Sequence, residues 1–389
     1  MGELSENDAV LLVCDYSLKY LGGAQTAFLR QAEALASEGV RVVVLAPDAD
    51  AARTGALEHA VLISPARRGT IPVLDLPLLG GARDLEPLIA ATVRRHRVGA
   101  IVVHSEFALA AACLAVGREL GVPVLHTVHT FFWRAPSALA PFAPLVGRVH
   151  RALTGIRTGR RSTGSSRIND ALRTMTLRIA ERADVVLSPS AHQAEALRRA
   201  GAGRVEAFSN VAQPLRLADP VSEGPLRLLW VARFAPEKRL EVALDAMRLV
   251  DAELGAGRVR LDVAGGAHRP LPGVEFHGPV SGERVGELMD GSDAVLITSL
   301  GFDNQPMVAL EAFAHGRPVI VSDPVLAGEF GPAALGTPTP DARGLADLVV
   351  ELAADRDRLA PHREAATAYA RDRQPSAHVA RLREIIASV

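Results

Sequence analysis

Residues 10–46, VLLVCDYSLKYLGGAQTAFLRQAEALASEGVRVVVLA, decide the fold class. They begin with an apolar run, Val10–Cys14, continue after a Gly-Gly turn with helical periodicity over Ala24–Ser37, and end with a β-branched run, Val40–Ala46. A strand, a helix and a second strand in this order form the βαβ unit of a parallel sheet that is covered by helices. The sequence therefore predicts an α/β fold.

The same alternation continues through the first half of the chain and restarts after an interruption. Helices are predicted at Asp84–Arg97 and Leu109–Leu120, and strands at Ala100–His104, Val122–Thr127 and Ala183–Ser188. The segment Pro214–Pro225 has three prolines and no apolar periodicity, which marks a linker. Beyond it, the predicted strands are Arg227–Ala232, Val259–Ala264, Val274–His277, Ala294–Thr298 and Pro318–Ser322.

These patterns predict two doubly wound Rossmann-like domains in tandem, a division that suits a chain of 389 residues. The first domain covers residues 1–213, the linker residues 214–225 and the second domain residues 226–374. We expect a C-terminal helix at residues 375–389 to pack back on the first domain. Because ligands of such sheets bind beyond the carboxyl ends of the strands, we expect the site in a cleft between the domains.

Composition limits the functions and compartments to be considered. The chain has 43 basic and 44 acidic residues, a balance that argues against a dedicated nucleic-acid binder. Cys14 and Cys113 lie in apolar runs and offer no disulfide framework or metal cluster. The N-terminus is acidic where a secretory signal is basic, and polar residues interrupt the longest apolar stretch. We therefore expect a cytoplasmic protein.

Charge is unevenly distributed along the chain. Residues 1–215 carry 24 basic and 19 acidic side chains, whereas residues 216–389 carry 19 and 25. Nine arginines and one acid lie between Arg134 and Arg178, beside the apolar stretch Ala138–Val146. This region fits either a solvated helical face or a surface for an acidic acceptor or an anionic membrane. A membrane surface would make the protein peripheral on the inner face of the membrane.

Two segments of the second domain carry charges where a ligand is expected. The first, WVARFAPEKR, spans Trp230–Arg239, follows a strand and opens a helix near Leu240. A helix N-terminus favours an anion, and Arg233 and Lys238 would add positive charge for a diphosphate. The alternative is that both are ordinary surface charges. Only 2 of the 43 basic residues are lysines, so a lysine here suggests a need for a compact ammonium group.

The second segment, ITSLGFDNQPMVALEAFAHGRPVI, covers residues 297–320 and places Asp303 in a loop before a helix with proline in its first turn. The backbone N–H groups of Met307 and Val308 would be available to phosphate oxygens. Glu311 follows two turns later among apolar residues, where a carboxylate without a partner is costly. Hydroxyl groups of a ligand would supply that partner.

In this order, the two segments resemble the family-four retaining glycosyltransferases of the GT-B fold, also called the group 1 glycosyltransferases. The resemblance implies that Arg233 and Lys238 hold the diphosphate of a nucleotide-sugar donor. It also implies that Glu311 binds the donor ribose and that Asp303 contacts the transferred sugar. Most members carry glutamate at the position of Asp303, so the reach of this acid is shorter by one methylene.

The first domain adds weaker matches to the same family. The loop LGGAQ resembles the family's glycine-rich loop, where Gly22 and Gly23 would allow a phosphate or an acceptor to approach closely; a plain βα turn is the alternative. The loop HTFFW resembles the family's histidine-bearing loop, and we expect its His129, rather than His104, to be catalytic. The candidate acceptor contacts are Lys19, Phe131, Phe132 and Trp133.

The expected function is a retaining, metal-independent transfer of a sugar from a UDP- or GDP-linked donor to the hydroxyl of a lipid-linked sugar, a glycan or a small molecule. No cofactor is expected, because no aspartate-rich metal motif is apparent. Two alternatives stay open: a nucleotide-sugar epimerase of the same architecture and a non-catalytic subunit that binds nucleotide sugars. A dinucleotide-dependent dehydrogenase fits less well, because no predicted strand is followed by the spaced glycine fingerprint.

Overall fold

The computed structural model describes residues 8–19, 22–53, 55–71, 76–133, 135–157, 166–219 and 224–389. Its contacts divide the chain into two units, Met1–Val211 with Pro375–Val389, and Ala212–Gln374. The second unit thus begins ahead of the linker expected at residues 214–225. The cause is local: the Ala212 N–H donates to the backbone carbonyl of Arg373, and the side-chain amide of Gln374 donates to the backbone carbonyl of Gln213.

The first unit contains a seven-stranded sheet in the order β3-β2-β1-β6-β7-β8-β9, and every neighbouring pair is parallel. Each strand predicted in this half is present, whereas the short strands β3 and β9 were not predicted. The strands are β1 (Ala9–Val13), β2 (Arg41–Leu45), β3 (Val61–Ile63), β6 (Val98–Val103), β7 (Val124–Thr127), β8 (Val185–Ser188) and β9 (Val205–Ala207). A separate antiparallel pair joins β4 (Gly69–Ile71) and β5 (Leu76–Leu78).

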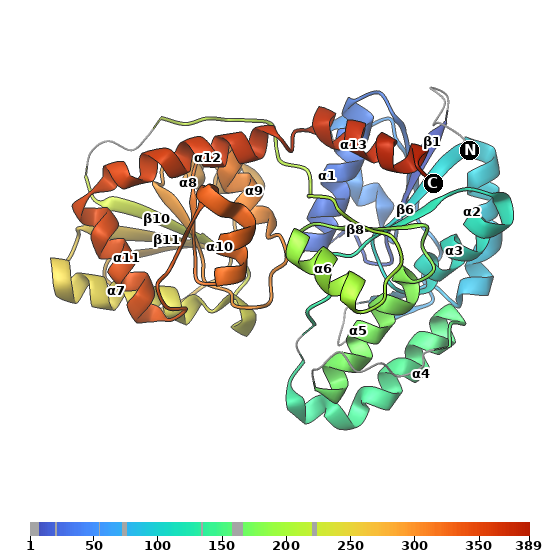
Figure 1. The fold of residues 1–389 in the computed structure, drawn as a ribbon, viewed down its shortest axis with the longest axis horizontal. Helices are drawn as coiled ribbons and strands as arrows, with labels where there is room; N and C mark the ends of the chain where they lie inside the picture. Colours follow the sequence, from blue (N-terminus) through green and yellow to red (C-terminus); the bar gives the residue numbers. More distant parts are fainter. Residues whose placement is uncertain are drawn as a thin grey trace. The chain divides into compact units, whose positions relative to one another are not determined.

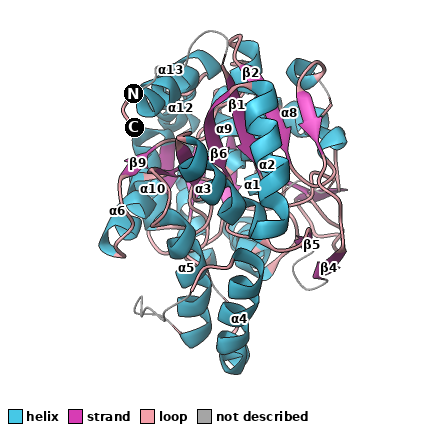
Figure 2. Ribbon diagram, turned by 90° about the vertical axis from the view of Figure 1, so that its right-hand side faces the viewer, coloured by secondary structure: helices cyan, strands magenta, loops and turns pink. Residues whose placement is uncertain are grey.

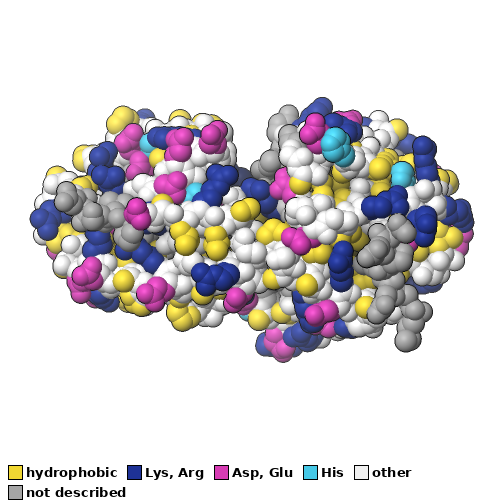
Figure 3. Space-filling view, turned by 90° about the horizontal axis from the view of Figure 1, so that it is seen from above, with side chains coloured by type: hydrophobic (Ala, Val, Ile, Leu, Met, Phe, Trp, Pro, Cys, Tyr) yellow, Lys and Arg dark blue, Asp and Glu magenta, His cyan; other side chains and the backbone are white. Residues whose placement is uncertain are grey.

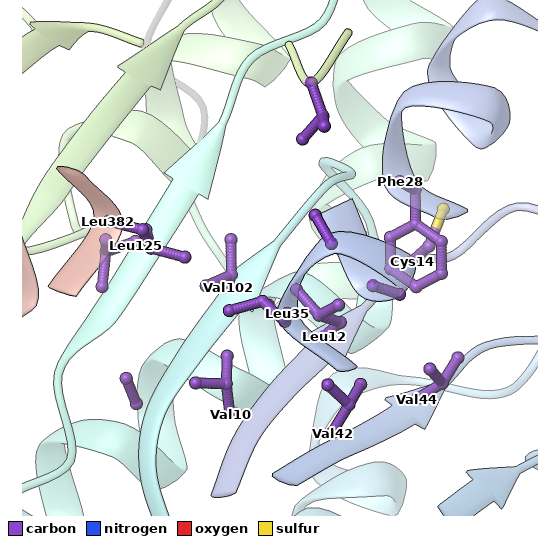
Figure 4. Packing of buried hydrophobic residues seen from close by; sticks show 14 of the residues in the cluster. Val10, Leu12, Cys14, Phe28, Leu35, Val42, Val44, Val102, Leu125 and Leu382 are labelled. Atoms are coloured by element: carbon purple, nitrogen blue, oxygen red, sulfur yellow. The ribbon is translucent and has the colours of Figure 1, made fainter. Parts of the chain in front are cut away.

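Helices cover both faces of this sheet (Figure 1). Because side chains alternate along a strand, Val10 and Leu12 of β1 enter one core, whereas Leu11 and Val13 enter the other. Figure 4 shows the first of these cores, to which the C-terminal helix α13 contributes Leu382. The helices are α1 (Gly23–Ser37), α2 (Ala82–His96), α3 (Ala108–Leu120), α4 (Ala143–Thr154), α5 (Arg167–Ala180), α6 (Ala191–Arg199) and α13 (Pro375–Ala387).

The second unit has a six-stranded parallel sheet in the order β12-β11-β10-β13-β14-β15. Its strands are β10 (Leu226–Val231), β11 (Val259–Ala264), β12 (Val274–Gly278), β13 (Ala294–Ile297), β14 (Val319–Val321) and β15 (Ala334–Gly336). Its helices are α7 (Leu240–Leu254), α8 (Gly282–Asp290), α9 (Met307–Ala314), α10 (Pro324–Phe330), α11 (Ala342–Ala354) and α12 (Ala360–Arg371). Both units therefore have the expected doubly wound α/β architecture.

Each sheet has one point where the strand order reverses. In the first unit β1 lies between β2 and β6, and in the second unit β10 lies between β11 and β13. The connections that leave the two strands on either side of such a point run to opposite faces, and a crevice opens at the carboxyl ends of the strands. The segments after β1 and β6, and after β10 and β13, are therefore the places where ligands are expected.

Helices α4 and α5 pack side by side and extend beyond the edge of their own sheet (Figures 1 and 2). No helix among the described residues is both long and apolar enough to cross a membrane. On the face seen in Figure 3, basic and acidic side chains are interspersed. Many ion pairs among the described residues join solvent-exposed neighbours on one helix, such as Arg199 and Glu195, and these pairs add little to stability.

Candidate functional site

The structure brings the two motifs of the second unit together at its switch point. Lys238 ends a short 3₁₀ turn after β10, and Asp303 lies in the loop after β13. Lys238 Nζ lies 2.6 Å from Asp303 Oδ1, and the two side chains keep only 19% and 11% of their surface exposed. The second carboxylate oxygen accepts a hydrogen bond from Ser299 Oγ at 2.6 Å. Because this ion pair is largely shielded from water, salt screens it weakly.

A buried hydroxyl fixes the loop that carries Lys238. Thr298, at the end of β13, accepts a hydrogen bond from Trp230 Nε1 at 2.9 Å and donates one to the Lys238 carbonyl at 2.7 Å. Trp230 and Thr298 are both 2% exposed. The role of Thr298 as a hydrogen-bond partner was not predicted from the sequence. The available signal was Trp230, because an indole N–H in a buried strand needs an acceptor.

A glycine allows the neighbouring loop to support the same segment. Gly265 follows β11 with φ +124°, a conformation that other residues rarely adopt. A Cβ at this position would lie 1.9 Å from the carbonyl oxygen of Ala232. The loop after β11 therefore lies directly against the backbone that precedes Arg233, and only glycine leaves the room for it.

The other predicted donor contacts lie nearby with different exposures. Arg233 is 72% exposed and pairs with Glu237 at 2.6 Å, so its guanidinium group is accessible from solvent. Glu311, half-buried on α9, has Gln213 Nε2 3.4 Å from its Oε1. The protein itself thus supplies one partner for the Glu311 carboxylate.

Helix α9 begins at Met307, directly after Pro306, which adopts extended backbone and contributes no side-chain cap. Val308, Lys238 and Asp303 line a small hollow of about 20 Å³, enough for one water molecule. The ammonium group, the carboxylate and the N-terminal turn of a helix therefore meet in one place. An anion that reached the Lys238 ammonium group would compete with Asp303 for it.

The predicted residues of the first unit lie after β1 and β7. Gly22 and Gly23 begin α1 and are exposed, whereas Leu21 of the same motif lies outside the described residues. Lys19 is 62% exposed and lies 3.3 Å from Asp48 Oδ1. His129 Nε2 lies 2.8 Å from Nδ1 of His104, the histidine that directly follows β6. Burial lowers the pKa of His129 to about 4, so the ring is neutral near pH 7.

The three aromatic residues expected to contact an acceptor have different environments. Phe131 does not fit that expectation, because it is 3% exposed and packs in a core formed with residues of α5, β8 and α6. Phe132 stacks on His192 at a centroid distance of 5.5 Å, and Trp133 Nε1 donates to Thr176 Oγ1 at 3.3 Å. Phe132 and Trp133 stay partly exposed and remain candidates.

Two buried carboxyl groups at the switch point of the first unit were not selected from the sequence. Asp15 follows β1 and accepts hydrogen bonds from Ser105 Oγ at 2.7 Å and from the Leu109 N–H at 2.9 Å, so it caps α3. Glu106 is 5% exposed and accepts a hydrogen bond from Tyr16 Oη at 3.3 Å. Burial, with a smaller contribution from the charge of Asp15, raises the pKa of Glu106 to about 8.

One group of three potential metal ligands occurs among the described residues. Asp262 of β11 and Glu275 and His277 of β12 lie within reach of a single ion. His277 Nε2 is already 2.6 Å from Asp262 Oδ1. These residues belong to β11 and β12, and none of them lines the hollow beside Lys238.

The Glu106 carboxyl group predicts a specific pH dependence of stability. Its pKa is higher in the folded than in the unfolded chain, so its contribution to stability is complete below about pH 4.5 and is lost as the pH rises through about 8. Glu106→Gln does not titrate at this position. The stability of this variant relative to wild type should therefore increase across that window by up to about 1.4 kcal/mol per pH unit.

Urea denaturation at several pH values between about 5 and about 8 measures this difference. The matched control is Glu119→Gln, the same substitution at a glutamate whose side chain is 67% exposed. A stability difference between Glu106→Gln and wild type that does not change with pH would contradict the assignment of a protonated, buried carboxyl group.

Solved structures with low sequence identity share this fold. Anabaena HepE, solved in complex with UDP and glucose, is 17% identical, with a TM-score of 0.69 over 98% of this chain and 100% of that one. Sucrose-phosphate synthase from Thermosynechococcus elongatus is 18% identical, with a TM-score of 0.63 over 98% and 100%. The pneumococcal O-GlcNAc transferase GtfA, in complex with UDP and GlcNAc, is 10% identical, with a TM-score of 0.68 over 98% and 99%.

Models of known families match both units. A search of curated proteins gave no match. The model of Glycosyltransferase Family 4 matches residues 21–211, and that of Glycosyl transferases group 1 matches residues 225–355. The first match includes α1 and the His129 loop, and the second includes Lys238, Asp303 and Glu311. The chain therefore has the GT-B fold, belongs to the family 4, group 1 glycosyltransferases, and is a glycosyltransferase.

Proposed function

We propose that this glycosyltransferase takes its sugar from a UDP-linked donor held at the switch point of the second unit. The observation that carries the proposal is the shielded contact between Lys238 and Asp303 beside the N-terminus of α9. A nucleotide diphosphate offers the negative charge that this place favours. UDP is proposed over GDP because HepE and GtfA were solved with UDP.

The leaving diphosphate gains negative charge as its bond to the sugar breaks. In the proposed reaction Lys238 and the N–H groups of Met307 and Val308 stabilise that charge, and the exposed Arg233 adds a second cation. A diphosphate bound to Lys238 releases the Asp303 carboxylate from its ion pair. That carboxylate then faces the sugar, where positive charge develops at the anomeric carbon, while Glu311 binds ribose hydroxyls.

We further propose that the reaction proceeds with retention of configuration and without a catalytic metal ion. Lys238, Arg233 and the helix terminus together supply positive charge of the kind that a metal ion would otherwise provide. The anomeric configuration of the product, read from proton NMR couplings, should equal that of the donor, and excess EDTA should leave the rate unchanged. Inversion would contradict the first part, and loss of activity restored by a divalent cation would contradict the second.

Lys238→Met should weaken UDP binding and slow sugar transfer. The substitution keeps the length of the side chain and removes a charge whose hydrogen bond to phosphate is worth about 1.5–3 kcal/mol, so UDP affinity should fall about tenfold or more. Calorimetric titration with UDP and a transfer assay measure the two effects.

Arg248→Met provides the control for the loss of a cation in the same unit. Arg248 lies on α7 and is 56% exposed, and its only described ionic partner is Asp245. Its replacement should leave UDP affinity and transfer close to wild type. Unchanged UDP affinity in Lys238→Met, or an equal loss in both variants, would contradict the proposed contact with the diphosphate.

We also propose that the α4–α5 hairpin holds the acceptor at an anionic membrane surface. Phe142, Leu145 and Val149 are spaced to share one helical face, and with Leu139 they are 39–54% exposed. Beside them lies a hollow of about 700 Å³ whose lining includes Arg148, Arg151, Arg157 and Arg167. Arg134 and residues 158–165 of the basic region lie outside the described residues. Apolar side chains next to arginines suit insertion among anionic headgroups, and this favours a lipid-linked acceptor.

Leu145→Gln should reduce binding to vesicles of phosphatidylglycerol and phosphatidylcholine about tenfold, because burial of a leucine contributes about 1.5–3 kcal/mol. The control is Leu217→Gln, which changes a leucine of similar exposure, 57% against 52%, in the second unit. Vesicle flotation at low and high salt measures binding. Equal binding of the two variants, or wild-type binding that does not respond to salt, would contradict this docking surface.

A further inference from the structure

Four side chains from distant parts of the first unit form one continuous chain of hydrogen bonds. His129 Nε2 lies 2.8 Å from His104 Nδ1, and His104 Nε2 lies 2.8 Å from Gln31 Oε1. Gln31 Nε2 in turn lies 2.8 Å from Nε2 of His378. The chain thus links the loop after β7, the end of β6, helix α1 and the C-terminal helix α13, and it crosses 347 residues of sequence between Gln31 and His378.

The direction of these hydrogen bonds is set at the far end, by a carbonyl group. A hydrogen bond between His378 and the backbone of Ser209 raises the pKa of His378. Because this bond favours the protonated ring, His378 is its donor. A carbonyl oxygen can only accept, and Nε2 of His378 faces Gln31, so the nitrogen that donates to Ser209 is Nδ1. A neutral His378 must then accept at Nε2. The amide nitrogen of Gln31, and not its oxygen, therefore faces His378.

The remaining protons follow from this orientation of Gln31. With its nitrogen toward His378, Gln31 turns its oxygen to His104, so Nε2 of His104 carries a proton and donates. Nδ1 of neutral His104 is then an acceptor, and the proton between the two rings belongs to Nε2 of His129. Nδ1 of His129 is consequently the nitrogen that carries a lone pair. One carbonyl group thus determines the tautomers of three histidines.

Apolar neighbours bury this chain of hydrogen bonds and keep its histidines neutral. Phe28 packs edge-on to His104 at a centroid distance of 5.0 Å, and Phe208 lies 4.3 Å from the ring of His378. His104 and His378 are 3% and 7% exposed. Burial lowers the pKa of His378 to about 3 and that of His104 well below its ordinary value. Neutral rings are the condition under which each nitrogen has a single, fixed role.

We propose that α13, through His378 and Gln31, fixes the tautomer and ring position of His129 so that its Nδ1 accepts a hydrogen bond from a substrate hydroxyl. The inference rests on the proposed function for its substrate, a sugar or a hydroxylated acceptor. His129 is the residue that touches substrate, whereas Gln31, His104 and His378 are positioning residues. The C-terminal helix, which returns to the first unit after the whole second unit, would thereby complete the site.

Nitrogen-15 NMR of the free protein with labelled histidines tests the tautomers directly. Wild type should show protonated Nε2 for His129 and His104 and protonated Nδ1 for His378. In His378→Phe the ring stays against Phe208 but its donor and acceptor are lost, so His129 should show shifts averaged between the two tautomers. His378→Gln restores a donor and an acceptor and should return His129 toward the wild-type shifts.

A matched variant separates this role from loss of packing. Val379 is 2% exposed on the same helix and lies in the core, outside the chain of hydrogen bonds. Val379→Ala should lower the melting temperature and leave the His129 shifts unchanged. With a nucleotide-sugar donor, His378→Phe should lower kcat about tenfold with little change in KM for the donor, whereas Val379→Ala should change neither.

A protonated Nδ1 on His129 in wild type would overturn the inference. So would His129 shifts that do not respond to His378→Phe, or that respond equally to Val379→Ala. Failure of the proposed function would give a different result, because no nucleotide sugar would be turned over. The histidine shifts and their response to the variants would still test whether the chain of hydrogen bonds fixes the tautomer of His129.

Discussion

The hydroxyl group of Thr298 connects the ends of β10 and β13, the two strands between which we propose that the donor binds. It bonds the Trp230 indole and the Lys238 carbonyl, so the end of β13 fixes the loop that leaves β10. This hydrogen bond complements the direct contact of 2.6 Å between the Lys238 ammonium group and Asp303, which belongs to the loop after β13. The parallel sheet creates a crevice at this switch point, and the buried Thr298 hydroxyl group supports the loop that carries Lys238 there.

The sequence allowed prediction of most of the fold, because β1 and its neighbours in the sheet are buried on both faces and read as continuous apolar runs. The domain boundary was less accurate, since Ala212 and Gln213 are held by Arg373 and Gln374, contacts that local composition does not reveal. Short strands such as β3, of three residues, carry too little periodicity to be recognised.

The charged residues of the site were recognisable, but their pairing was not. Lys238 and Asp303 are 65 residues apart, and only the order of the strands brings them together. Phe131 was assigned to a surface because it lies in a loop with other aromatic residues, yet α5 and α6 enclose it. Asp15 and Glu106 were overlooked because each is a single acid beside an apolar run, a pattern without a distinctive spacing.

The two units use charge in different ways. At the switch point of the second unit, the charges of Lys238 and Asp303 are paired and largely shielded from water, and in the proposed function a ligand's diphosphate replaces Asp303 as the partner of Lys238. In the first unit, Asp15, His104 and Glu106 are buried. Burial raises the pKa of Glu106 and lowers that of His129, and both shifts favour the neutral form of the group. Neutral groups with fixed hydrogen bonds suit the orientation of hydroxyl groups, and a paired ammonium group suits a diphosphate.

The most direct test of this account is a crystal structure of the protein with a bound UDP-sugar. The account predicts the β-phosphate within hydrogen-bond distance of Lys238 Nζ and of the N–H groups that begin α9, with Asp303 released from Lys238. A diphosphate bound elsewhere, or one bound beside an intact ion pair between Lys238 and Asp303, would contradict it.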